Sequence, residues 1–194
     1  MKEPLPLAKV HDAVLEFLRH RDDAALFGAQ AVNAYVDEPR MTQDVDILST
    51  RAGALAEDIR AHLAGLFHMA VRVREVAQGQ GFRVFQLRQP RNRYLADVRQ
   101  VDQLPPTQLI AEIRVPLPEV LIAQKIISLS NRLGQPKADL DRRDLKVLLL
   151  AFPHLKAVAG AVLDRLHAAG AEDRAMVQWR ELVATEIQPE EGAW

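Results

Sequence analysis

The chain has 194 residues, of which 48% are hydrophobic and 26% charged, and its formal net charge is -1. This length suits one compact domain or two small ones, and the near-neutral charge argues against a protein that coats nucleic acid through bulk electrostatics, although a local basic patch can still dock an RNA. The absence of cysteine excludes disulfides and thiolate metal sites. Because no apolar run approaches the roughly 20 residues that span a bilayer and the first residues lack a leader pattern, we expect a soluble, cytoplasmic protein.

The first elements predicted are a helix, a short strand and a second helix. Ala24 to Phe27 is an apolar run that stops at Gly28, and we expect a brief strand there followed by a helix over 29–36. Gly28 then lies where the N–H groups of a helix start can face a phosphate, and the alternative is a plain strand-to-helix turn. The preceding helix ends near residue 21 and is marked by apolar residues at helical spacing: Val10, Val14, Phe17 and Leu18.

An acidic strand is predicted next. Asp44 and Asp46 are separated by one apolar residue and followed by Ile47 and Leu48. Side chains two apart on a strand point to the same face, so the two carboxylates project together. Two like charges at such range repel unless a cation lies between them, which predicts a divalent metal site. The alternative is an Asp-x-Asp triplet on a solvated edge or in a turn.

The sheet continues after one more helix. Ser49 or Thr50 is positioned to cap a helix running to about Phe67, and strands over 69–77 and 82–88 are joined by a hairpin at Gly79-Gln80-Gly81. A third strand over 94–101 carries Asp97 on the same face as Leu95 and Arg99. Asp97 is therefore a candidate third carboxylate. The alternative is a structural ion pair of Asp97 with Arg99 or Arg93.

The composition changes at Leu104-Pro-Pro and again at Pro116-Leu-Pro118, after which the pattern is helical. We place a domain boundary there, with residues 1–117 in one domain and 118–194 in a helical one. Four helices are expected, the first beginning at Pro118 and the others spanning 139–152, 154–169 and 171–187. Lys125 is an isolated charge among apolar neighbours, which indicates either a phosphate partner or a solvated face. Asp144 follows Asp141 by three residues and is a candidate helix cap or a supporting residue.

These motifs together resemble the nucleotidyltransferase superfamily to which polymerase beta belongs, and most closely its AbiEii-type abortive-infection toxins. The resemblance extends from Gly28 to about Leu150. Ala29 departs from the pattern, because the family usually has Ser or Gly at this position. Alanine lacks the serine hydroxyl that would contact a nucleotide phosphate. The matching positions are Gly28, Ala31, Arg40, Thr42, Asp44, Asp46, Ile47 and Leu48 in the first part, and Pro118, Lys125, Arg132, Asp141, Asp144 and Leu145 in the second.

The resemblance implies an α+β fold in which a nucleotidyltransferase-like mixed sheet flanked by helices precedes a C-terminal helical bundle. It implies an enzyme that uses Mg2+ or Mn2+ to move a nucleoside monophosphate from a nucleoside triphosphate to an acceptor hydroxyl. Asp44, Asp46 and Asp97 would ligate the metal. Lys125 would neutralise the triphosphate with Asp144 in support, the two facing the carboxylates across a cleft between the halves. The remaining nucleotide contacts would come from Gly28, Ala29, Arg40 and Thr42.

The resemblance also sets expectations about partners. The acceptor could be a tRNA end, a protein hydroxyl or a small molecule, and a toxin of this type would have an antitoxin partner. No membrane association is expected. Two other classes of function stay open: a catalytically degenerate nucleotidyltransferase domain that acts as a binding module, and a scaffold whose helical half binds a partner.

Overall fold

The computed structural model describes residues 6–37 and 39–189 and contains two compact units. The first comprises Met1–Ala31 and Arg40–Pro116, and the second comprises Val32–Pro39 and Leu117–Trp194. The division after Pro116 lies one residue before the boundary expected from the sequence. The short segment Val32–Pro39 was expected in the first domain but groups with the helices.

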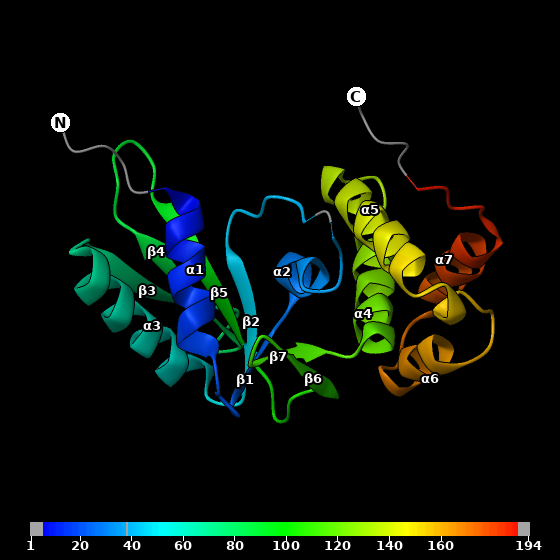
Figure 1. The fold of residues 1–194 in the computed structure, drawn as a ribbon, viewed down its shortest axis with the longest axis horizontal. Helices are drawn as coiled ribbons and strands as arrows, with labels where there is room; N and C mark the ends of the chain where they lie inside the picture. The colour runs from blue at the N-terminus through cyan, green and yellow to red at the C-terminus, as the bar shows by residue number, and fades with distance from the viewer. Residues whose placement is uncertain (1–5, 38, 190–194) are drawn as a thin grey trace. The chain divides into compact units, whose positions relative to one another are not determined.

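The first unit is built on a five-stranded mixed sheet (Figure 1). Strands β2 (Val45–Ser49) and β5 (Arg93–Gln100) run parallel to each other, and the other three neighbouring pairs are antiparallel. The sheet order is β1-β2-β5-β4-β3, with bounds Ala24–Leu26, Val45–Ser49, Arg93–Gln100, Gly81–Gln86 and Val71–Val76.

Helix α1 (Leu7–Leu18) packs against α3 (Ala52–Phe67), and α3 covers one face of the sheet. A Cβ added at Gly53 of α3 would lie 3.1 Å from Cζ of Phe82 in β4, so Phe82 points toward α3. Because side chains alternate along a strand, Arg83 points to the opposite face. Its partner across the ladder, Asp97, points there too. The face away from α3 therefore carries the charged side chains of the central strands.

Three local expectations differ from the structure of the first unit. Helix α2 covers only Gly28–Asn33, shorter than the predicted 29–36. Ser49 ends β2 and does not cap a helix, because its Oγ accepts the N–H of Arg51 before α3 begins. The proline-bounded stretch before the boundary forms a hairpin of β6 (Thr107–Ile110) and β7 (Ile113–Pro116), which the sequence analysis did not predict.

The second unit is helical, with α4 (Pro118–Asn131) at its centre. α4 contacts each of the three other α-helices and is buried along most of its length. The helix predicted over 154–169 is wrong in its first half, where a 3-10 turn (η1) leads into a loop that ends at Gly160 with φ +129°. None of the helices described is long and apolar enough to cross a membrane. The elements are α4 (Pro118–Asn131), α5 (Pro136–Ala151), η1 (Pro153–Leu155), α6 (Ala161–Ala168) and α7 (Asp173–Ala184).

Candidate active site

Two carboxylates lie side by side on the central parallel pair of strands. Asp46 of β2 and Asp97 of β5 are direct register partners. Neighbouring strands are about 4.8 Å apart, so side chains at paired positions on one face stand next to each other. Strands β2 and β5 are therefore neighbours, and the side chains of Asp46 and Asp97 share the face of the sheet away from α3.

Asp44 lies outside the strand. The ladder of β2 begins at Val45, and Asp44 occupies the bend that leads into it, so the prediction that one strand presents both Asp44 and Asp46 is wrong. His11 of α1 has a hydrogen bond to the backbone of Gln43, the residue before Asp44. Burial lowers the pKa of His11, against the opposing effect of that hydrogen bond. Asp44 therefore lies just before the paired part of β2.

Gly28 lies directly against Asp46. Its φ is +61°, and a Cβ added to it would lie 2.2 Å from Oδ2 of Asp46. The N–H of the preceding residue, Phe27, donates to the backbone oxygen of Asp46 at 2.9 Å. Any side chain at position 28 would displace the carboxylate, so glycine is required by both the conformation and the contact. Ala29 follows as a buried methyl, 8% exposed.

The loop before β2 is tied to α2. Oγ1 of Thr42 accepts a hydrogen bond from the side-chain amide of Gln30 at 2.9 Å. Arg40 is half-buried, and one of its guanidinium nitrogens donates to the carbonyl of Met41 at 3.4 Å. The hydroxyl of Thr42 is thus engaged within the unit, and it fixes where the loop enters the acidic strand.

Arg83 is a residue of the site that the sequence analysis missed. Its Nη2 donates to Oδ2 of Asp97 at 3.0 Å, and this hydrogen bond raises the pKa of the guanidinium. The ion pair expected as an alternative for Asp97 therefore exists, and Arg83 is a partner in it that the sequence did not suggest. Arg99 stacks instead on the ring of Phe27, at 4.9 Å. The register of β4 against β5 places Arg83 opposite Asp97, and periodicity alone does not fix that register.

The donor chemistry of this site fits a hard divalent cation. Carboxylate oxygens are the ligands that Mg2+ and Mn2+ prefer. The absence of a side chain at Gly28 also lets the carboxylate of Asp46 lie directly against the backbone there. Within the described ranges, however, no three histidine or acidic side chains stand close enough together to hold an ion. Asp46 and Asp97 are therefore the pair on which a metal site would be built, with Asp44 in the adjoining bend.

Lys125 and Asp144 belong to a buried network inside the helical unit. Nζ of Lys125 lies 2.7 Å from Oδ2 of Asp144 and 3.1 Å from Oδ1 of Asp141. Lys125 is 7% exposed and Asp144 is fully buried. The second oxygen of Asp141 accepts from Ser128 and Arg132, each at 2.9 Å. The network therefore joins α4 to α5.

For each residue of this pair, one of the alternatives left open by the sequence is wrong. Lys125 does not lie on a solvated face, because its side chain is buried with two carboxylates. Asp144 does not cap a helix, because α5 begins at Pro136 and places Asp144 in the helix interior.

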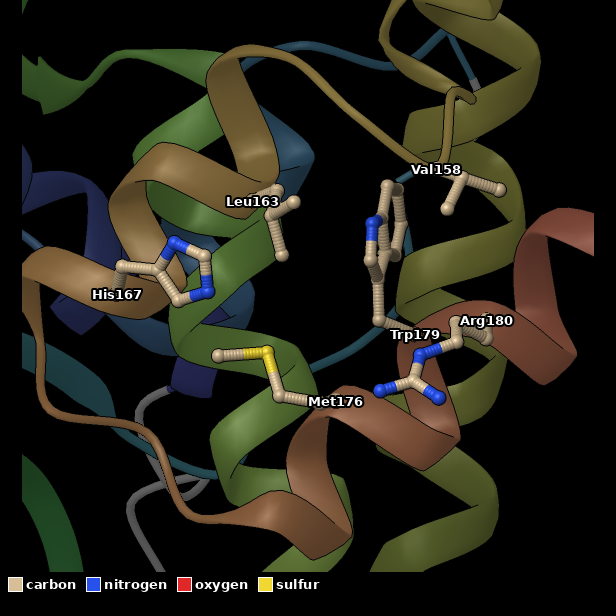
Figure 2. A pocket seen from close by; sticks show the side chains of 6 residues that line it. All are labelled: Val158, Leu163, His167, Met176, Trp179 and Arg180. Atoms are coloured by element: carbon tan, nitrogen blue, oxygen red, sulfur yellow. The ribbon is translucent and has the colours of Figure 1, made fainter.

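A separate pocket of about 170 Å3 lies in the helical unit (Figure 2). Figure 2 shows the indole nitrogen of Trp179 on the side of the ring where Leu163 and His167 lie. None of the lining side chains is a carboxylate, so the pocket offers no ligand for a hard cation and lies outside the candidate site. It is lined by Val158, Leu163, His167, Met176, Trp179 and Arg180.

Comparison with known proteins reveals likeness in structure alone. No protein-family model matches the sequence, and no curated protein matches it. Among solved structures, the Megavirus polyadenylate synthase aligns with a TM-score of 0.61 at 14% identity over 76% of this chain. The alignment spans 32% of the viral protein, so the chain corresponds to about a third of its length.

Two further structures match over nearly their whole length. An antigenic nucleotidyltransferase-like protein from Paracoccidioides brasiliensis has a TM-score of 0.52 at 19% identity, covering 94% of both chains. The antibiotic-resistance factor ANT(2'')-Ia has a TM-score of 0.52 at 14% identity, covering 90% of this chain and 95% of its own. At such low identity these likenesses establish the fold. The chain has the mixed sheet, flanking helices and C-terminal helical bundle of nucleotidyltransferase-like proteins, as the sequence analysis predicted.

Proposed function

We propose that the chain is a metal-dependent nucleotidyltransferase, which moves a nucleoside monophosphate from a nucleoside triphosphate to an acceptor hydroxyl. The observation that carries the proposal is the pairing of Asp46 with Asp97, beside a glycine whose missing side chain makes room for the carboxylate. The nucleotidyltransferase-like fold supports the same reaction class, and two solved structures that share the fold are described as a polyadenylate synthase and an antibiotic-resistance factor.

The residues of the site have distinct proposed roles. Asp46 and Asp97 hold Mg2+ or Mn2+ from neighbouring strands, and Asp44 remains a proposed third ligand, which would have to move from the bend to reach the same ion. A divalent ion bound there would lower the pKa of an acceptor hydroxyl and offset charge on the leaving pyrophosphate. Gly28 lets a phosphate approach the backbone next to Asp46.

The nucleotide contacts first expected of Ala29, Arg40 and Thr42 remain proposals. Of these, Ala29 offers only its backbone N–H, because its side chain is a methyl group. A triphosphate role for Lys125 would require its ammonium to exchange buried carboxylates for phosphate oxygens. We therefore assign Lys125 and Asp144 to the integrity of the helical unit.

The experiment that tests the reaction uses the intact protein, Mg2+ or Mn2+ and each labelled nucleoside triphosphate in turn, with cellular RNA and protein extracts as acceptors. We expect label from one nucleotide to appear in one acceptor class, RNA or protein, and to disappear with Asp46→Asn. Asp46→Asn should keep the fold, because it removes one of several neighbouring negative charges. A cooperative loss of fold in this variant would make Asp46 structural and contradict the proposed metal site.

The finer part of the proposal is that the chain is the toxin of a toxin–antitoxin pair, with a tRNA as its acceptor. It rests on the resemblance of the motifs around Asp44 and Asp46 to AbiEii-type toxins. Induced expression of the chain should arrest growth, expression of Asp46→Asn should not, and the labelled acceptor should be tRNA. Growth unaffected by an active enzyme would refute the toxin role and leave the transfer reaction standing.

A second candidate function is a catalytically degenerate domain that binds a nucleotide without transferring it. The hydroxyl missing at Ala29 favours this alternative. Metal-dependent binding of a triphosphate, measured by calorimetry, without label transfer to any acceptor would support the binding module over the enzyme.

A further inference from the structure

Four charged side chains form a row across the sheet on the face away from α3. Asp46 pairs in register with Asp97, Asp97 with Arg83, and Arg83 with Arg74 of β3. The row therefore places two carboxylates next to two guanidinium groups. The inner guanidinium, that of Arg83, forms an ion pair with Asp97 of the candidate site.

The contact between Arg83 and Asp97 uses a single carboxylate oxygen. Nη2 of Arg83 donates to Oδ2 of Asp97 at 3.0 Å, and the side chains are 32% and 14% exposed. A one-oxygen contact fixes the rotation of a carboxylate while its second oxygen stays available as a ligand. Bidentate pairing, as between Arg21 and Asp23 in the same unit, engages both oxygens.

Arg83 is itself held from a second side. Its guanidinium carbon lies 5.0 Å from the centre of the Tyr94 ring. A cation over an aromatic face is attracted to it and loses freedom to rotate. Tyr94 and Asp97 belong to the same strand, so β5 contacts Arg83 at both places.

We propose that Arg83 is a positioning residue for the metal site: it holds Asp97 by one oxygen, under restraint from Tyr94, and presents the other oxygen beside Asp46. The inference rests on the proposed function, because it assigns a role toward the cation that function requires. Residues that hydrogen-bond to a metal ligand typically contribute about 10–100-fold to metal affinity. A purely electrostatic role would have the opposite sign, since a nearby positive charge repels a metal ion and its removal would tighten binding.

The test is Mn2+ binding to the intact protein, measured by electron paramagnetic resonance, together with thermal unfolding. We expect Arg83→Met to weaken Mn2+ binding about 10–100-fold, and Arg83→Lys to recover part of the loss. Arg74→Met is the matched control, because it removes the same charge from the next position in the row and should leave binding within about two-fold. Unchanged or tighter binding in Arg83→Met would overturn the proposal.

A second variant, Tyr94→Leu, tests the proposal if Arg83→Met does not fold. Tyr94→Leu removes the ring that restrains Arg83 while keeping the ion pair, and Tyr94 is 41% exposed. We expect it to weaken Mn2+ binding with little change in unfolding temperature, and unchanged binding would contradict the restraint. Wild-type binding that is lost in Asp46→Asn supports the metal site whatever Arg83 does. No binding by the wild type would refute both the site and the role of Arg83.

Discussion

At the scale of single residues, Gly28 has a left-handed backbone and also contacts the candidate metal ligand Asp46. Gly28→Ala would place a methyl 2.2 Å from Oδ2 of Asp46 in a backbone with φ +61°. We expect about 1–2 kcal/mol of destabilisation from the left-handed backbone, and in addition a loss of Mn2+ binding because Asp46 must move. Denaturant unfolding and Mn2+ titration measure the two effects.

Gly170 provides the control for this substitution. Its φ is also +61°, but a Cβ there would meet no atom within 4 Å. Gly170→Ala should show the same backbone cost and leave Mn2+ binding unchanged. Equal Mn2+ affinities in Gly28→Ala and Gly170→Ala would show that the contact between Gly28 and Asp46 does not contribute to metal binding.

A second residue-scale prediction concerns acid stability. Arg21 hydrogen-bonds both oxygens of Asp23 at 2.8 Å and holds the pKa of that carboxyl below its usual value. The unfolded chain therefore takes up a proton at higher pH than the folded one. The stabilisation from Asp23 is present above about pH 4 and is lost as the pH falls through the folded pKa. Asp23→Asn should lower stability at pH 7 and flatten its decline between about pH 4 and 2.

Urea unfolding at a series of pH values measures this difference. The exposed neighbour Asp22 is the control, since Asp22→Asn removes a carboxylate of the same type without breaking the pair with Arg21. If the unfolding free energy of Asp23→Asn falls as steeply below about pH 4 as that of the wild type, the pair of Arg21 and Asp23 does not cause the decline.

At the scale of elements, α4 and α5 are joined through buried charge. Lys125→Met would remove the ammonium that pairs with Asp144, which is fully buried, whereas Asp141 would keep its ion pair with Arg132. Breaking a buried ion pair by removing one partner typically costs about 3–5 kcal/mol. We expect a loss of that order in urea unfolding, with Lys146→Met on the exposed side of α5 nearly neutral.

A double-mutant cycle separates the pair from packing. If the loss arises from uncompensated charge, adding Asp144→Asn to Lys125→Met should recover part of the stability. Additive losses would assign the effect of Lys125→Met to its packing alone.

The elements also show which parts of the sequence are informative. The long helices, the β3–β4 hairpin and the strand of Asp97 were predictable, since each has sustained periodicity or a glycine turn. The short β6–β7 hairpin was not, because four-residue strands beside prolines carry little pattern. For Lys125 the sequence left a phosphate partner and a solvated face open, because one charge among apolar residues is ambiguous until the facing helix supplies Asp141 and Asp144.

At the scale of the whole molecule, the candidate site depends on contacts between distant parts of the chain. Asp46 and Asp97 become neighbours only because β5 pairs in parallel with β2. The motif around Asp46 can be recognised from a few neighbouring residues. Placing Arg83 at the site requires the register of β4 against β5 and that of β5 against β2. Candidate ligands could therefore be predicted from local motifs, whereas Arg83, the ion-pair partner of Asp97, could not.

The final prediction is that a metal ion and a nucleotide act on the first unit without engaging the Lys125 network. Binding to a folded region protects its backbone amides from exchange in proportion to the stabilisation that the ligand provides. Hydrogen exchange with Mg2+ and a non-hydrolysable nucleoside triphosphate should slow exchange around Gly28 and in β2 and β5. Exchange in α4 around Lys125 should stay unchanged, since its ammonium already contacts two carboxylates at 2.7 and 3.1 Å. Nucleotide-dependent protection around Lys125 that disappears in Lys125→Met would instead restore the triphosphate role first expected from the sequence.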